Sequence, residues 1–259
     1  MLSVIKIGGN VIDDPAKLDT FLKTFASIDG PKILVHGGGK IATDIGRQMG
    51  IEPKYADGRR ITDAATLHLV TMVYGGLINK QITAQLQALG CNAIGLTGAD
   101  ASIIPAQKRP VKAIDFGFVG DVTSDQINTG ILKIMLDAGL TPVLAPLTHD
   151  GAGNMLNTNA DTIAQEVAKA LSSLFTVQLI YCFEKKGVLS DPSNEDSVIS
   201  RIVATTFEAL KSNGTVSGGM IPKLENALAA VSSGVQQVVI GAADDLELLI
   251  NNQAGTVIA

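Results

Sequence analysis

The sequence predicts an α/β protein whose mostly parallel central sheet is covered by helices on both faces. Short apolar runs alternate with helical stretches along the whole chain, and strands that alternate with helices form parallel sheets. The apolar runs are bounded by Gly, Pro or polar residues, which is typical of central parallel strands. With 259 residues, of which 46% are hydrophobic and 17% charged, the chain is long enough to bury a substantial core.

The elements follow one another in a regular order. Buried strands are predicted at 3–7, 32–36, 92–97, 141–145, 177–182 and 237–240. Helices are predicted at 15–28, 63–89, 159–173 and 218–233. Asp13 and Asp14 suit an N-cap before Pro15, and Gly75-Gly76 is a potential interruption of the long second helix.

Two segments break the alternation. Residues 54–61 and 103–123 carry turn formers and short apolar runs, so we predict hairpins or flaps over an edge of the sheet. No Pro- or Ser-rich linker divides the chain. We therefore expect one domain, residues 1–259, built from closely packed lobes of about 1–172 and 173–259.

Composition excludes several classes of protein. The net charge of −5 and the pI of about 5.2 argue against a general nucleic-acid binder. Cys91 and Cys182 lie in apolar stretches, which predicts buried thiols in a reducing compartment. There is no Cys/His cluster for a metal, no apolar run long enough to span a membrane, and no room for a signal peptide before Lys6. We expect a cytoplasmic protein without a membrane or nucleic-acid partner.

Two glycine-rich turns follow the first two strands. In Lys6-Ile7-Gly8-Gly9 the glycines let the backbone approach an anion, and Lys6 within the apolar strand needs an anionic partner. A strand-end turn with a lysine that reaches solvent explains this segment equally well. The second turn, His36-Gly37-Gly38-Gly39, feeds a helix and forms a ready anion site.

The second turn also permits a different class of function. Gly37-x-Gly39-x-x-Ala42 approximates the dinucleotide fingerprint, and Asp57 or Asp63 falls near the position of a ribose-binding acid. A dinucleotide-binding oxidoreductase is therefore an alternative. Against it, this turn does not follow the first strand, and the first glycine turn stays unexplained. The P-loop pattern is absent.

Three further segments carry polar groups that capping alone does not explain. Adjacent Arg59 and Arg60 can supply a bidentate carboxylate clamp. Asn157-Thr158-Asn159-Ala160-Asp161 opens a helix, and one of its polar residues suffices as the cap. In Gly218-Gly219-Met220-Ile221-Pro222-Lys223 a cation occupies an early helical turn, which an anionic ligand would favour.

Taken together, these segments resemble the amino acid kinase family, and within it the acylglutamate branch of N-acetylglutamate kinases. The matching motifs occur in the family's order: Lys-x-Gly-Gly at 6–9, His-Gly-Gly-Gly at 36–39, Gly-x-Arg-x-Thr at 58–62, Asn-x-Asn-Ala-Asp at 157–161 and Gly-Gly-Met-x-Pro-Lys at 218–223. The resemblance implies a three-layer αβα sandwich with the acid in the N-terminal lobe and ATP in the C-terminal lobe. It also implies ATP-dependent phosphorylation of the side-chain carboxylate of N-acetyl-L-glutamate, a step of arginine biosynthesis.

The resemblance also implies roles for individual residues. Lys6 and Lys223 would contact the phosphates, Gly9 and Gly38 would donate N–H groups to the transferred group, and Asp161 would orient the two lysines. The acid would be held by Gly37, Gly38, Arg60 and Asn157. The nucleotide would be bordered by Lys6, Gly8, Gly9, Lys185, Gly187, Gly218 and Lys223. Mg²⁺ would be bound through the nucleotide phosphates, with no metal ligand among these residues.

Some features leave alternatives open. N-succinyl-L-glutamate or N-acetyl-α-aminoadipate would fit the same anion clamps, and Lys108, Arg109 and Lys112 lie where a second carboxylate would be met. The segment Phe183-Glu184-Lys185-Lys186-Gly187 departs from the family's usual Ser/Thr-Asp-Val-x-Gly, which puts the nucleotide contacts of this loop in doubt. The chain begins almost at its first strand, without the N-terminal helix of the arginine-inhibited hexamers. We therefore expect a homodimer that is insensitive to arginine.

Overall fold

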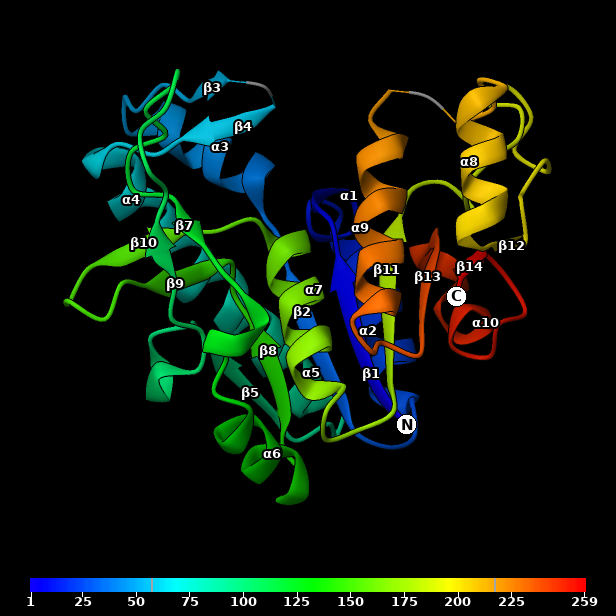
Figure 1. Ribbon diagram of the computed structural model, residues 1–259. Helices are drawn as coiled ribbons and strands as arrows, with labels where there is room; N and C mark the ends of the chain where they lie inside the picture. Colours follow the sequence, from blue (N-terminus) through cyan, green and yellow to red (C-terminus); the bar gives the residue numbers. More distant parts are fainter. Residues whose placement is uncertain (57, 217) are drawn as a thin grey trace.

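The computed structural model describes residues 1–56, 58–216 and 218–259, and its centre is an eight-stranded sheet (Figure 1). The strand order is β12-β14-β13-β11-β1-β2-β8-β5. These strands span Leu2–Ile7 (β1), Lys32–His36 (β2), Ala93–Leu96 (β5), Thr141–Leu144 (β8), Val177–Phe183 (β11), Arg201–Ile202 (β12), Gln237–Ala242 (β13) and Thr256–Ile258 (β14). All six predicted strands are present, and the missed β14 pairs antiparallel with β13 at the C-terminal end of the chain.

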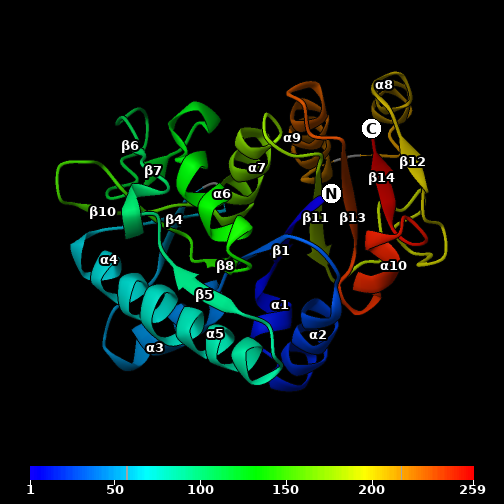
Figure 2. The same cartoon turned by 90° about the horizontal axis from the view of Figure 1, so that it is seen from below.

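Helices cover both faces of this sheet, which confirms the predicted αβα layering (Figure 2). The helices are α1 Gly9–Ile12, α2 Pro15–Ser27, α3 Gly39–Gln48, α4 Ala64–Val70, α5 Asn79–Ala88, α6 Thr129–Asp137, α7 Ala160–Leu171, α8 Ala204–Ser212, α9 Met220–Ser232 and α10 Leu246–Ile250. Short 3₁₀ turns span Asp100–Ser102 (η2), Ser124–Gln126 (η3) and Ala243–Asp245 (η4).

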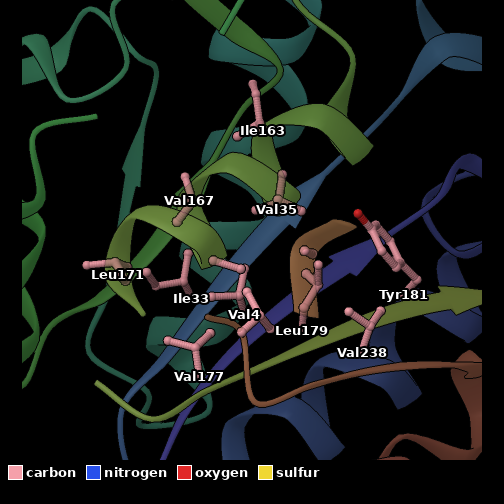
Figure 3. Packing of buried hydrophobic residues seen from close by; sticks show 14 of the residues in the cluster. Val4, Ile33, Val35, Ile163, Val167, Leu171, Val177, Leu179, Tyr181 and Val238 are labelled. Atoms are coloured by element: carbon pink, nitrogen blue, oxygen red, sulfur yellow. The ribbon is translucent and has the colours of Figure 1, made fainter. Parts of the chain in front are cut away.

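Alternation along β1 divides the core into two clusters. Val4 faces the cluster formed with α6, α7, α8 and α9, and Ile5 faces the one formed with α2, α4, α5 and α10. Figure 3 shows side chains of α7, among them Val167, packed against strand residues such as Val35 and Leu179. A parallel strand that is buried on both faces needs a continuous run of apolar residues. For this reason β1, β2 and β11 could be predicted from the sequence.

The long predicted helix at 63–89 is continuous in the structure but changes type. Between α4 and α5 lies a π-helix, η1, at Thr71–Ile78, and Gly75-Gly76 falls inside it instead of interrupting the helix. A Cβ on Gly75 would lie 3.2 Å from Leu147 Cδ1 and 3.3 Å from Thr97 Cγ2. Close packing therefore explains Gly75, and π-helical segments are often found at functional sites.

Both irregular segments contain hairpins. β3 (Lys54–Ala56) pairs with β4 (Arg59–Ile61), and β6 (Gln107–Lys108) pairs with β7 (Gly120–Asp121). A third pair joins β9 (Leu147–His149) to β10 (Met155–Asn157). Isolated bridges between Thr62 and Gly117 and between Val119 and Asn157 tie the three together. They lie at one end of the sheet (Figure 1).

The strands divide by sequence across the middle of the sheet. Those before residue 172, namely β1, β2, β8 and β5, form one half, and those after it form the other. Within the described ranges, none of the helices is long and apolar enough to cross a bilayer.

Candidate active site

The candidate residues converge at the carboxyl ends of three adjacent parallel strands. The register sets Lys6 of β1 opposite Tyr181 of β11, and Ile7 opposite His36 of β2. The glycine turns at 8–9 and 37–39 therefore leave the sheet side by side. Ligands of open α/β sheets bind at this edge, so the topology by itself brings together two of the predicted motifs.

Lys6 is paired with a carboxylate, as its burial requires. Its Nζ lies 2.6 Å from Asp161 Oδ1, and the two side chains are 10% and 38% exposed. The ammonium and the carboxylate therefore form an ion pair. Asp161 stands in the first turn of α7, where the helix dipole favours an anion. The N-cap is Asn159, whose Oδ1 accepts from the N–H of Asp161 at 2.7 Å.

Lys223 comes to the same place from a different element. It lies in the first turns of α9, exposed at the surface, and its Nζ is 4.2 Å from the centroid of the Phe183 ring. The Nζ of Lys6 is 5.4 Å from the same centroid. The structure thus gathers Lys6, Asp161 and Lys223 around the end of β11.

The glycine turns begin helices. Gly8 is the N-cap of α1 and Gly38 the N-cap of α3. Gly38 has φ +139°, and a Cβ there would collide with Ile78 Cδ1 of η1, so no other residue fits. The N–H of Gly37 donates to Ile7 O at 3.2 Å. The predicted role of Gly37 in binding the acid therefore has to come from its position in the cavity wall and not from that N–H.

A cavity of about 300 Å³ opens beside the second turn. Arg60 and Asn157 line it together with Gly37, Gly38 and Tyr74, and Arg59 and Arg109 add two more guanidinium groups. Arg60 Nη2 donates to Gly39 O at 2.9 Å and to Thr43 Oγ1 at 2.8 Å. Asn157 Nδ2 donates to Thr62 Oγ1 at 3.0 Å. These bonds fix both side chains in a cavity suited to a small anion.

A second cavity lies beside Lys223. Its walls include Gly8, Gly9, Phe183, Lys185, Gly187, Met220 and Lys223. Lys185 is exposed and pairs with Glu195 at 2.8 Å. A Cβ on Gly187 would lie 2.8 Å from Thr256 Oγ1 and from Val198 Cγ1, so close packing alone accounts for this glycine. Gly218, just before α9, has φ +55°.

A smaller cavity joins these two. It shares Arg59, Asn159 and Thr162 with the first, and Phe183, Lys223 and Ile240 with the second. Asp161 lines it as well. Asp161 and Lys223 thus line the space between the first cavity and the second. Asp57, the proposed ribose-binding acid, and Ser217, next to Gly218, lie outside the described residues. Asp63 is the N-cap of α4 and accepts from the N–H of Thr66.

A buried histidine supports the second glycine turn. His36 Nδ1 lies 2.8 Å from Gly37 O, and because a carbonyl only accepts, Nδ1 carries the proton. Nε2 then accepts from Asn79 Nδ2 at 3.2 Å, and Asn79 also donates to Val143 O. Burial, with a smaller effect of Lys80, lowers the pKa of His36 to about 4. The imidazole is neutral and anchors the turn.

Stability should therefore fall in mildly acidic solution. Between the unfolded pKa of about 6.5 and the folded pKa of about 4, the unfolded chain binds a proton that the folded chain does not. The contribution of neutral His36 to the free energy of unfolding is fully present above pH 6.5. It is lost as the pH falls toward 4, by at most about 3 kcal/mol. Urea unfolding at pH 4.5 to 7.5 measures it. The dependence of the free energy of unfolding on pH should persist in His68→Gln, because His68 is exposed, and should flatten in His36→Gln. An unchanged pH dependence in His36→Gln contradicts the assignment.

Sequence reasoning missed several residues of the site. Tyr74 and Tyr181 were recognisable only as residues of a predicted helix and strand, and Phe183 only as the first residue of the unusual loop at 183–187. Arg109 was predicted, with Lys108 and Lys112, to lie where a second carboxylate would be met. In the structure Arg109 pairs with Asp121 at 2.6 Å and lines the first cavity. Among the described residues there is no group of three or more His, Cys, Asp or Glu side chains that could hold a metal ion.

Comparisons with known proteins agree with this geometry. The model of the amino acid kinase family matches residues 1–242. The chain is 56% identical over 257 residues to a protein of Phocaeicola vulgatus named acetylglutamate kinase, with 99% of this chain and 98% of that one covered. It is 59% identical over 251 residues to a protein of the same name from Cytophaga hutchinsonii, with 96% and 94% covered.

Solved structures share the fold. A Streptococcus mutans protein has a TM-score of 0.75 at 28% identity and covers 100% of this chain and 98% of its own. The carbamate kinase of Giardia lamblia bound to AMP-PNP has a TM-score of 0.69 at 14% identity, with 99% and 97% covered, which concerns the fold alone. Nothing in these comparisons supports the oxidoreductase alternative. The cluster of Lys6, Asp161 and Lys223, the two glycine turns and the family match lead to one conclusion: this chain belongs to the amino acid kinase family.

Proposed function

We propose that the chain transfers the γ-phosphoryl group of ATP to the side-chain carboxylate of N-acetyl-L-glutamate, in arginine biosynthesis. One observation carries the proposal: the cavity that contains Asp161 and Lys223 joins an arginine-lined cavity to one bordered by the glycine turn of β1. The names of the relatives that match nearly the whole chain support the same reaction.

The acid occupies the first cavity, within the lobe at about 1–172. Arg60 binds its α-carboxylate, and Asn157 binds neighbouring polar atoms. Gly37 and Gly38 form the wall next to the reacting carboxylate. Since a carboxylate is ionised at neutral pH, no general base is needed.

The nucleotide occupies the second cavity, largely in the lobe at about 173–259. Gly8, Lys185 and Gly187 line this cavity, and Gly218, just before α9, borders the nucleotide. Lys6 and Lys223 neutralise charge on the phosphates, Gly9 and Gly38 donate backbone N–H groups to the transferred group, and Asp161 keeps Lys6 in place. Mg²⁺ is bound through the phosphate oxygens. In-line transfer depends on such positioning and charge stabilisation.

The test is turnover of MgATP with N-acetyl-L-glutamate, N-succinyl-L-glutamate and N-acetyl-α-aminoadipate in parallel, with hydroxylamine to trap the acyl phosphate. Product with the first acid alone supports the proposal. Product with only one of the other two acids identifies that acid as the substrate of the same kind of phosphoryl transfer. Folded protein that gives product with none of them contradicts the proposal.

A second candidate substrate carries an extra carboxylate on the acyl group, as N-succinyl-L-glutamate does. The observation that favours it is Arg109, which lines the first cavity in addition to Arg59 and Arg60. Asp121 offsets part of its charge, yet a guanidinium has five donors and can bind a second carboxylate.

Arg109→Met should then reduce kcat/KM for N-succinyl-L-glutamate relative to N-acetyl-L-glutamate. The expected change is roughly tenfold, since a charged hydrogen bond contributes about 1.5 kcal/mol or more. Lys112→Met is the matched control, because Lys112 does not line this cavity. An equal effect of Arg109→Met on both acids contradicts the second candidate.

We further propose a cytoplasmic homodimer. The two free cysteines are buried, as in proteins of a reducing compartment. Met72 and Leu77 of η1 are 52% and 39% exposed, and β5 ends the sheet. An apolar helix surface beside a sheet edge is suited to a two-fold interface.

Sedimentation should give about twice the 26.9 kDa chain mass. Met72→Glu with Leu77→Glu should dissociate the dimer, because charges at the centre of an interface are costly. Ile134→Glu, at an exposed position of α6, is the control. A hexamer, or a dimer unchanged by the first pair, contradicts this proposal.

A further inference from the structure

One aromatic ring contacts both lysines of the candidate site. Phe183, the last residue of β11, has its ring centroid 4.2 Å from Lys223 Nζ and 5.4 Å from Lys6 Nζ. Cations within about 6 Å of a ring face are attracted by its quadrupole. The roles described above assign the ring no part in the reaction.

The two ammonium groups differ in their other partners. Lys6 has Asp161 at 2.6 Å. For Lys223, no carboxylate of the described residues lies within 4.0 Å, and the ring is its close contact. A carboxylate in place of the ring would neutralise the lysine and repel an incoming phosphate. The ring attracts the ammonium without adding a negative charge.

The ring is held firmly by the sheet. Tyr181 stacks against it, with centroids 6.1 Å apart and planes 23° from parallel. The Tyr181 hydroxyl donates to the backbone carbonyl of Asp161 at 3.2 Å, and Tyr181 is buried opposite Lys6 in β1. Phe183 is therefore a fixed point in a central strand, whereas Lys223 belongs to a helix on the surface.

The ring also faces the ligand cavities. Phe183 and Lys223 both line the connecting cavity and the second cavity. An aromatic ring in a cavity wall can act in two ways: through the cation beside it, or by contact with a bound base or sugar. The two actions are separable, because only the first depends on the phosphates.

We propose that Phe183 is a positioning residue, which holds the ammonium of Lys223 where the β- and γ-phosphates of the nucleotide arrive. The proposal rests on the proposed nucleotide site and not on the identity of the acid. Without the ring, Lys223 would lose its preferred place over β11, and part of the binding free energy would be spent on ordering its side chain.

The experiment compares Phe183→Leu and Phe183→Tyr with the unchanged chain by calorimetric titration of AMP and of AMP-PNP with Mg²⁺. Leu keeps an apolar side chain and lacks the quadrupole. We expect Phe183→Leu to weaken AMP-PNP binding roughly 2- to 30-fold, the range of cation–π contributions, and to leave AMP binding unchanged. Phe183→Tyr, which keeps an aromatic ring, should bind AMP-PNP about as tightly as the unchanged chain does. Equal weakening for both nucleotides would show contact with base or sugar and overturn the proposal.

A double-mutant cycle tests the route of the effect. In the Lys223→Met background, Phe183→Leu should weaken AMP-PNP binding no further. A full additional loss in that background means that the ring does not act through Lys223, which also overturns the proposal.

Fluorinated phenylalanine at position 183 tests the ring if Phe183→Leu does not fold. Each added fluorine weakens the negative face while nearly preserving ring size, so AMP-PNP affinity should decrease with fluorine number; constant affinity contradicts the proposal. If the unchanged chain binds no nucleotide, that result contradicts the proposed function itself. Binding without any dependence on Phe183 removes only this inference.

Discussion

Lys223→Met should reduce kcat by about 10²- to 10³-fold while the protein stays folded. In the proposed reaction Lys223 stabilises charge that develops on the transferred phosphoryl group, and removal of one such electrostatic group has an effect of this size. Lys223 is exposed and lies within 4.0 Å of no carboxylate among the described residues. The midpoint of thermal unfolding should therefore hardly change.

Lys211→Met is the matched control for this prediction. Lys211 lies on the neighbouring helix α8, where it pairs with Glu225 of α9 and approaches the Phe207 ring, but it lines none of the three cavities. The Lys211→Met variant loses the same charge as Lys223→Met. Because that charge lies outside the cavities, its kcat should stay near that of the unchanged chain. If Lys223→Met keeps its kcat, or if Lys211→Met loses as much, the role of Lys223 is wrong.

Asp161→Asn should reduce kcat by about 10²-fold and destabilise the fold as well. Lys6 would lose its counterion in a nearly buried site and move from its place beside the phosphates, and small misplacements of a catalytic group cost that much. Removal of one partner of a buried ion pair costs 3 to 5 kcal/mol. Because the Asp161 side chain is 38% exposed, we expect about 1 to 3 kcal/mol.

Chemical denaturation and single-turnover kinetics together test this prediction. Asp137→Asn, which breaks the exposed pair with Lys133, is the control and should change neither quantity. Adding Lys6→Met to Asp161→Asn should recover part of the stability, because the unpaired charge is then gone, but not the turnover. Recovery of turnover in the double variant is the result that contradicts the assigned pairing.

The fold could be predicted well from the sequence because its strands are buried on both faces. Six apolar runs of 4 to 6 residues led to six of the eight strands of the main sheet. The missed strands β12 and β14 are short, with two and three residues, and in such strands tertiary contact and not local pattern decides the conformation. The π-helix at Thr71–Ile78 was missed for a related reason: two adjacent glycines indicate a break unless the packing of Gly75 is known.

The candidate site could be predicted only in part. Lys6 and Lys223 were found because each charge stands where burial or a helix dipole makes it unfavourable without a partner. Asp161 was found because the start of its helix carries more polar residues than capping requires. Tyr181 gave no such signal, since an aromatic residue in a strand is ordinary core, and Phe183 carries no charge that would set it apart within the loop at 183–187. Their importance comes from contacts with residues far away in the sequence: Tyr181 contacts Asp161, 20 positions before it, and Phe183 contacts Lys6, 177 positions before it.

The two lysines of the cluster are carried by different kinds of element: Lys6 by a central strand, and Lys223 by a helix on the molecular surface. A displacement of α9 against the sheet therefore moves the ammonium of Lys223 and leaves that of Lys6 in place. The connecting cavity lies between α7 and α9, with Gln165 and Asn226 in its walls. A small molecule lodged there would separate Lys223 from Lys6 and inhibit transfer, which makes this space an attractive place for inhibitor design.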